Sequence, residues 1–143
     1  MTAVLNANHF IFQAEDPTTP GTFLTLAGQR TTKETFTSAL VDVTNKDSGS
    51  SWRQIGDGMG LQHVQLSCNC IFSDTASHAA MKTYCQNQTI FPGRVVNTDT
   101  LKGDVGNFKI TQLELTGDHE NAIMGQYTIE SDSQVLFDQA ITL

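Results

Sequence analysis

Two histidines stand next to carboxylates in this sequence, and their types and spacing suggest acid–base chemistry. His119 is flanked by Asp118 and Glu120, and His78 follows Asp74 by four residues. A carboxylate beside an imidazole can orient it and adjust its pKa for general acid–base catalysis. His119, however, lies in a polar turn, and the Asp74–His78 spacing is typical of an exposed histidine in the first turn of a helix. We therefore expect neither histidine to be catalytic.

Three cysteines are the other reactive side chains. Cys68 and Cys70 alternate along one predicted strand and point the same way, so a disulfide between them would be strained. Neither these residues nor Cys85 has histidines at metal-ligand spacing, and we interpret all three as small buried residues of a reducing compartment. The sequence contains no phosphate-binding glycine loop and no G-x-S-x-G elbow. It therefore predicts no enzyme activity, no metal and no cofactor.

The composition is that of one small domain with few charges. The chain has 143 residues, of which 16% are charged and 19 are Thr, and we expect a single domain over 1–143. Fifteen acidic and eight basic residues give a net charge of −7. This charge argues against a nucleic-acid-binding protein, which needs clustered Lys and Arg, and against binding to an anionic membrane. No apolar run reaches the roughly 18 residues that a membrane span requires.

Most of the chain alternates apolar and polar residues, the two-residue period of a half-buried strand. The clearest run covers 61–72 and places His63 on the polar side, in solvent or at an interface. The alternation changes phase at Thr111–Gln112, which predicts a β-bulge. We expect Pro92–Gly93 to interrupt one strand. The other predicted strands cover 9–14, 22–27, 30–37, 89–97, 108–115, 123–129 and 135–140, with polar turns at 116–121 and 131–134.

One segment favours a helix. Asp74 is the predicted N-cap, and Ala76, Ala80 and Tyr84 recur at helical spacing with Met81 and Cys85 beside them. The pattern ends by Gln88, before Pro92–Gly93. The fold class that follows is mainly β, flanked by one α-helix.

Residues 40–60 have no clear period and form a long predicted loop. Two polar clusters flank the single Trp52, and Gly56, Gly58 and Gly60 alternate after it. A loop of this length in a compact domain is usually functional or disordered, and a tryptophan argues against disorder. Two interpretations of Trp52 stay open: it fills the core of its own domain, or it contacts another subunit.

The residues of this loop also carry a resemblance to a known family. The chain resembles the major tail proteins, or tail tube proteins, of long-tailed phages and phage-like gene transfer particles. The resemblance runs from about Thr22 to the C-terminus. It rests on Val41–Ser48 (VDVTNKDS), Trp52–Gln54 (WRQ), Gly58–Leu61, Phe72–Asp74, Gly106–Ile110 with Leu113–Glu114, Gly117–Glu120 and Tyr127–Ser131.

The resemblance implies a fold and a function. The fold would be two packed antiparallel sheets, a sandwich or barrel, with one helix and a long assembly loop at 40–60. Six subunits would form a ring whose inner strands join into one barrel, and stacked rings would form the channel through which DNA leaves the capsid. The implied partners are copies of the chain, then the tape measure, tail terminator and baseplate proteins, with DNA passing unbound. The implied location is the particle tail, after assembly from the bacterial cytoplasm.

The resemblance also suggests which residues make contacts between subunits or rings. We expect these contacts from Asp42, Thr44, Asn45, Asp47, Trp52 and Arg53. Arg53 would pair with a neighbour's carboxylate, and Trp52 would anchor in a partner groove. A polar or acidic channel lining would repel phosphates, whereas basic side chains would slow DNA.

Three alternatives remain at this point. The chain could be the tube protein of a related contractile or secretion machine, which would share the fold. It could be a small β-sandwich binding module, although one Trp and two Tyr make a poor aromatic binding surface. A small enzyme is the third, and the absence of a catalytic constellation argues against it.

Overall fold

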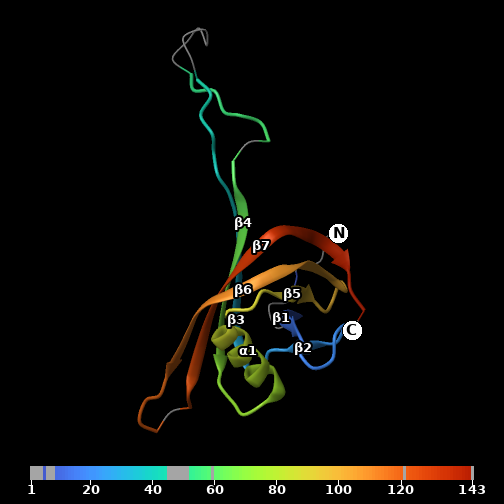
Figure 1. Ribbon diagram of the computed structural model, residues 1–143, viewed down its shortest axis with the longest axis vertical. Helices are drawn as coiled ribbons and strands as arrows, with labels where there is room; N and C mark the ends of the chain where they lie inside the picture. The colour runs from blue at the N-terminus through green and yellow to red at the C-terminus, as the bar shows by residue number, and fades with distance from the viewer. Residues whose placement is uncertain (1–4, 6–8, 45–51, 59, 121, 143) are drawn as a thin grey trace.

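The computed structural model describes residues 5, 9–44, 52–58, 60–120 and 122–142. It confirms a mainly β fold with one helix (Figure 1). The elements in chain order are β1 (Phe10–Glu15), β2 (Phe23–Thr25), β3 (Gln29–Ser38), β4 (Gln62–Ile71), α1 (Ala76–Asn87), β5 (Phe91–Asn97), β6 (Lys102–Thr116) and β7 (Met124–Ala140).

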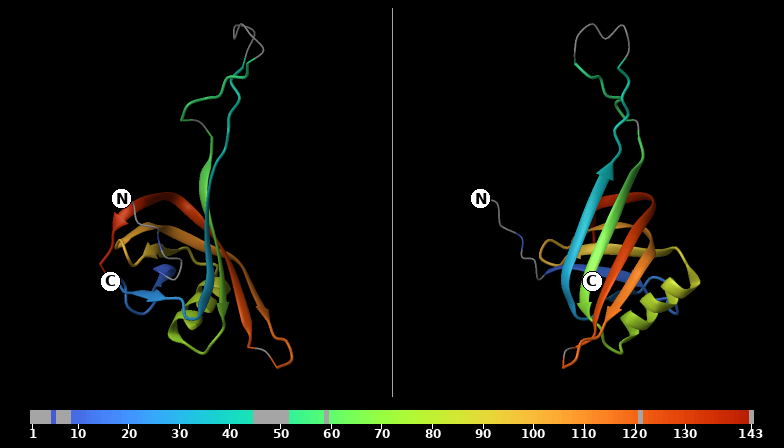
Figure 2. Two further views of the ribbon diagram at one scale, coloured as in Figure 1. Left: turned by 180° about the vertical axis from the view of Figure 1, so that it is seen from behind. Right: turned by 90° about the vertical axis from the view of Figure 1, so that its left-hand side faces the viewer.

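The strands form one antiparallel sheet in the order β2-β1-β5-β6-β7-β4-β3. The sheet curls on itself but does not close, so the two expected sheets are two sections of one sheet (Figure 2). The long strands β6 and β7 belong to both sections. We call β3, β4, residues 124–130 of β7 and residues 109–116 of β6 the four-stranded section.

The core lies inside the curl and is built from the apolar phase of each strand. On β4, Val64, Leu66, Cys68 and Cys70 are buried, as the alternation predicts. The rings of Phe12 and Phe108 meet edge to face at 6.3 Å across the core. Residues of α1 close one end of this core, which positions the helix on the inner side of the sheet.

Irregular pairing bends the two long strands. The predicted bulge is confirmed, because the β6–β7 register shifts between Ile110 and Gln112. The predicted turn at 131–134 is wrong, since β7 runs through it, with Ser133 at φ 62°.

The predicted break at Pro92–Gly93 is also wrong, because β5 includes both residues. Pro92 fits there because pairing with β1 ends at Gly93, so its missing N–H costs no bond to that strand.

The helix differs from expectation at its start and on its buried side. Its N-cap is Thr75 rather than Asp74, and Thr75 makes no capping bond through its side chain. At the other end Gln88 adopts the left-handed conformation, φ 54°, and its N–H bonds back to the Cys85 carbonyl, which ends the helix where the sequence predicts. The buried residues are Ser77, His78, Ala80, Met81 and Tyr84.

His78 is buried, so the prediction of an exposed first-turn residue is wrong. Its ring is 1% exposed, and its Nε2–H donates to the Ala27 carbonyl at 2.9 Å. The Tyr127 hydroxyl, 2.8 Å away, then donates to Nδ1. One imidazole thus ties α1 to β7 and to the β2–β3 turn, a structural role that satisfies both ring nitrogens.

Gln29 joins the two ends of the curled sheet. Its Nε2 donates to the carbonyls of Phe12 and Leu26, both at 2.9 Å. Its Oε1 accepts from the Phe12 N–H at 3.0 Å and from the Thr32 hydroxyl at 2.7 Å. Since β2 pairs with β1 only over residues 13–15, the Phe12 backbone lies past the end of β2. The Gln29 amide, together with the Leu26 N–H that donates to the Phe12 carbonyl at 3.3 Å, provides the hydrogen bonds that a longer β2 would provide there.

Three carboxyl groups, from β3, β6 and β7, lie close together. Glu34 of β3 is half-buried, and burial, a hydrogen bond with Asp104 and the charges of Asp104 and Asp138 raise the pKa of Glu34 to about 8. The Asp138 N–H also donates to Asp104 Oδ1 at 3.1 Å. Glu34 is therefore protonated at neutral pH, and like-charge repulsion keeps the proton there.

We expect Gln29→Ala to destabilise the fold by about 2–4 kcal/mol, because the buried Phe12 N–H loses its hydrogen-bond acceptor and the Phe12 carbonyl keeps only the Leu26 N–H as a donor. Equilibrium denaturation of the unassembled protein measures this. Gln65→Ala, on the exposed side of β4, is the matched control and should change the free energy of unfolding by less than about 0.5 kcal/mol. Equal effects of the two substitutions would show that the hydrogen bonds from Gln29 to the Phe12 backbone do not stabilise the fold.

We expect Glu34→Gln to stabilise the protein increasingly as the pH rises from about 4.5 to about 8. The pKa of Glu34 is higher in the folded state than in the unfolded state. The contribution of the wild-type side chain to the free energy of unfolding is therefore fully present below about pH 4.5 and is lost as the pH rises toward 8. Solvent screening of a half-buried group keeps the effect modest, and we expect about 2–4 °C in melting temperature at pH 8. Melting curves across this range test it, with Glu130→Gln as control; a pH-independent difference would contradict it.

Candidate assembly surfaces

Residues 39–44, 52–58, 60 and 61 belong to an arm that continues β3 and β4 away from the body of the domain (Figure 1). The Ala39 N–H donates to the Leu61 carbonyl at 2.8 Å, and the Gly56 N–H donates to the Val41 carbonyl at 2.8 Å. Further out, Asp42 and Ile55 form an isolated antiparallel bridge. The described part of the predicted loop is thus a narrow two-stranded ribbon.

Gly60 lies where the arm leaves the body. Its φ is +100°, and a Cβ added there would lie 2.1 Å from the Ala39 carbonyl oxygen. Only glycine fits this close approach of the two chains. One of the three alternating glycines in the sequence therefore has a direct structural cause.

The polar residues expected to make contacts also hold the arm together. The Thr44 N–H donates to Asp42 Oδ1 at 2.8 Å, and the Thr44 hydroxyl accepts from the Gln54 N–H at 2.7 Å. Hydrogen bonds from Thr44, together with the nearby charge of Arg53, hold the pKa of Asp42 below its ordinary value. Asp42, Thr44 and Arg53 are exposed. Asn45 and Asp47 lie outside the described residues.

Trp52 is on the surface of the arm, with 80% of the side chain exposed. The interpretation that it fills the core of its own domain is therefore wrong. Other large apolar residues of the arm are exposed as well, namely Leu40, Val43, Ile55 and Leu61. A two-stranded ribbon has no second layer against which to bury them. Their gathering on one projection is typical of a surface that another protein covers.

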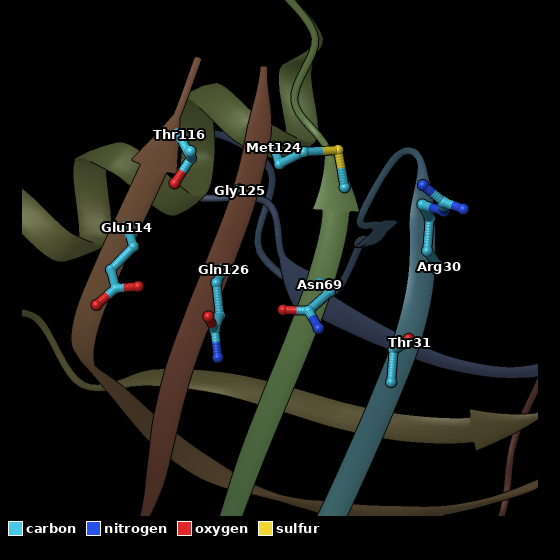
Figure 3. A pocket seen from close by; sticks show the side chains of 8 residues that line it. All are labelled: Arg30, Thr31, Asn69, Glu114, Thr116, Met124, Gly125 and Gln126. Atoms are coloured by element: carbon cyan, nitrogen blue, oxygen red, sulfur yellow. The ribbon is translucent and has the colours of Figure 1, made fainter. Parts of the chain in front are cut away.

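The outer side of the four-stranded section is a polar face made of cross-strand rows. One row is Thr31–Asn69–Gln126–Glu114, and part of it lines a shallow hollow of about 380 Å³ (Figure 3). In Figure 3, α1 lies behind this section, on the side away from the polar face. The next rows are Lys33–Ser67–Thr128–Gln112 and Thr35–Gln65–Glu130–Lys109.

The four-stranded section has an unpaired strand edge on each side among the described residues. β3 is the last strand of the sheet and pairs only with β4. At the other side, β5 pairs with β6 only from Lys102 to Phe108, so residues 109–116 have no strand beyond them. Each strand is antiparallel to the next, which makes β3 antiparallel to β6. The pairing register reveals both edges, which the alternation pattern does not.

The reactive side chains do not assemble into a catalytic or metal site within the described residues. The His119 side chain is 95% exposed, and its Nε2 lies 3.6 Å from Oε1 of the neighbouring Glu120. The three cysteines are unpaired, and burial raises the pKa of the Cys68 thiol to about 12, which keeps it protonated. No group of His, Cys, Asp and Glu in the described part of the chain could hold a metal ion. No described helix could cross a membrane.

Comparisons with known proteins agree with this geometry. The model of the phage tail tube protein family matches residues 4–137. A search of the curated proteins found no match. Solved structures share the fold. The tail of an empty gene transfer agent particle, determined with six-fold symmetry, has a TM-score of 0.87 and 24% identity over 95% of this chain and 100% of its own.

Two further solved structures are similar. A chain of the virion of a native gene transfer agent particle has a TM-score of 0.85 and 22% identity, covering 95% of this chain and all of its own. The SPP1 tail tube has a TM-score of 0.81 and 12% identity over 97% of this chain and 81% of its own. At such identities the likeness shows the fold.

The domain is a curled antiparallel sheet with two unpaired strand edges, a polar outer face and a projecting arm with exposed apolar residues. These features are typical of a class of proteins that assemble with others. The match over residues 4–137 then makes the assignment: the chain belongs to the phage tail tube protein family. This confirms the resemblance found in the sequence.

Proposed function

We propose that this protein is the subunit of a tail tube, forming hexameric rings that stack into a channel for DNA. The observation that carries the proposal is the pair of unpaired antiparallel edges on one four-stranded section. If β3 of one copy pairs with residues 109–116 of the next copy, the sheet continues without a change of direction. Such head-to-tail contacts close into a ring and remove the exposed edges.

The number six is supported by the symmetry of a structural neighbour. The tail of the gene transfer agent particle was determined with six-fold symmetry, and its subunit has the fold of this chain. Rings of this chain would place the four-stranded sections side by side around a common axis. The polar face is free of α1, so it is the surface we assign to the channel (Figure 3).

The polar face suits a channel that DNA crosses without being held. Its three rows consist mainly of Thr, Ser, Asn and Gln. The charged residues in these rows are Lys33 and Lys109 against Glu114 and Glu130, and Arg30 lies beside the first row, so the expected lining is polar with a few charges of both signs rather than acidic. DNA binding depends on many basic side chains that displace phosphate counterions, and this face offers few.

The arm is the part of the subunit that we assign to contacts with a neighbouring subunit or ring. It projects beyond the body and exposes Trp52 with other apolar residues. Asp42, Thr44, Asn45, Asp47, Trp52 and Arg53 remain the proposed contact residues. Asp42 and Thr44 would act partly by keeping the described arm extended, since both bond within it.

The proposed partners and location follow from the same role. Copies of the chain form the tube, and tape measure, terminator and baseplate proteins meet it inside and at its ends. The subunit would be made in the bacterial cytoplasm and end in the tail of a phage or gene transfer particle. The proposal includes no contractile sheath and no catalysis. The family assignment favours this structural role over a binding module or an enzyme.

We expect the purified protein to form rings or tubes with a regular axial repeat and six-fold end views in electron microscopy. The physical reason is that each copy has two edges that another copy can pair. The sample should be examined over a range of protein concentrations, because the contacts are intermolecular. A protein that stays monomeric at high concentration would contradict the proposal and favour a small binding module.

We expect Trp52→Ala to leave the fold intact and to yield soluble protein with few tubes. Loss of a buried aromatic anchor commonly costs about 2 kcal/mol per contact, which would raise the critical concentration for assembly about 30-fold. Sedimentation of assembled protein measures this. Ile90→Ala, an exposed apolar residue away from the arm, is the control. Normal polymerisation of the Trp52 variant would show that this side chain does not anchor the tube.

A further inference from the structure

Opposite charges lie at the two ends of the hollow on the polar face. Arg30 and Thr31 of β3 lie at one end of the hollow, and Glu114 of β6 lies at the other (Figure 3). The β3–β4 register shifts between Gln29 and Thr31, and this irregularity brings Arg30 onto the same face as Thr31. Lys33 follows on that face in the next row. On this face the β3 edge therefore carries two positive charges, whereas the β6 edge carries Glu114 in the row of Thr31 and Lys109 two rows away.

These charged side chains form no ion pair with other described residues. The ion pairs between described residues are His9–Asp99 and His119–Glu120, which involve none of them. Arg30, Lys33 and Glu114 are all exposed. Glu114 accepts a hydrogen bond from Gln112 Nε2 at 2.6 Å, which orients the carboxylate beside its neighbour on the same strand.

We propose that Glu114 of one copy binds between Arg30 and Lys33 of the next copy and so selects how subunits pair. The inference rests on the ring geometry of the proposed function. When the sheet continues from copy to copy without a step, the row that ends at Glu114 continues at Thr31. Arg30 and Lys33 then flank the incoming carboxylate, and diagonal neighbours on adjacent strands lie about 7–8 Å apart, within reach of long side chains.

The charge pattern discriminates between two ways in which edge strands can pair. Two β3 strands related by a two-fold axis close to Arg30 and Lys33 would bring these basic residues against each other. Two β6 strands related by a two-fold axis at Glu114 would bring two carboxylates together. Like charges held together in this way are strongly disfavoured. Pairing of β3 with β6 brings opposite charges together. The pattern therefore favours head-to-tail rings over two-fold dimers, which would stop growth.

The register is selected in a similar way. A slip by one residue would turn the polar side chains of the incoming strand toward the core side. A slip by four residues would move Glu114 away from both basic side chains. An exposed ion pair contributes little by itself, but the same contact recurs at every junction of a closed ring. Its effect should weaken as added salt screens the charges.

Two charge-reversal variants test the proposal when they are assayed alone and mixed. We expect Glu114→Lys to raise the critical concentration for tubes tenfold or more, because every junction becomes positive on both sides. The double variant Arg30→Glu with Lys33→Glu should do the same with negative charge. Mixed in equal amounts, the two should assemble near the wild-type concentration, because alternating subunits restore an opposite-charge pair at every junction. Sedimentation and electron microscopy measure assembly.

The controls separate this inference from the proposed function and from misfolding. Melting curves check that each variant is folded, and Asp132→Lys on β7 makes the same charge change away from both edges and should assemble normally. Wild-type protein that forms no tubes contradicts the proposed function itself. Wild-type tubes together with normal assembly of the single variants overturn the charge inference alone. Failure of the folded variants to assemble on mixing overturns it as well.

Discussion

Every backbone N–H and carbonyl at the edge of a sheet needs a hydrogen-bond partner, and this constraint organises the molecule. Seven strands curl far enough to enclose a core but not far enough to close. At Phe12 the gap is filled from within, because the Gln29 side chain provides the acceptor for the N–H and, with the Leu26 N–H, the donors for the carbonyl. At the outer edge of β3 and beyond Phe108 of β6 the described residues offer no further strand, and in the proposed ring a neighbouring copy would supply one.

The two long strands connect the core to these edges. In β6, residues up to Phe108 pair with β5, and the bulge at Thr111 follows as the strand enters the four-stranded section. The bulge keeps Ile110 and Leu113 on the core side while Gln112 and Glu114 reach the outer face. A single irregularity thus lets one strand contribute to the core of its own subunit and to a polar surface.

The arm and the edges expose different chemistry, which suits contacts in different directions. The edges offer backbone groups and a few charges, and these can specify a partner strand by direction and register. The arm offers Trp52 and other apolar side chains on a ribbon too thin to bury them. In the proposed tube, contacts of the first kind would close a ring, and contacts of the second kind would reach the next ring.

The sequence by itself determined the strand content, the one helix, the bulge at Thr111–Gln112, the exceptional segment 40–60 and the family. These features depend on local periodicity or on a continuous motif. Only the tertiary structure decided that His78 is buried against Tyr127, that Glu34 meets Asp104 and Asp138, and that Arg30 and Glu114 line the same hollow. The reason is physical. These relations join residues far apart in the chain, and the strand register that brings them together is a property of the whole sheet.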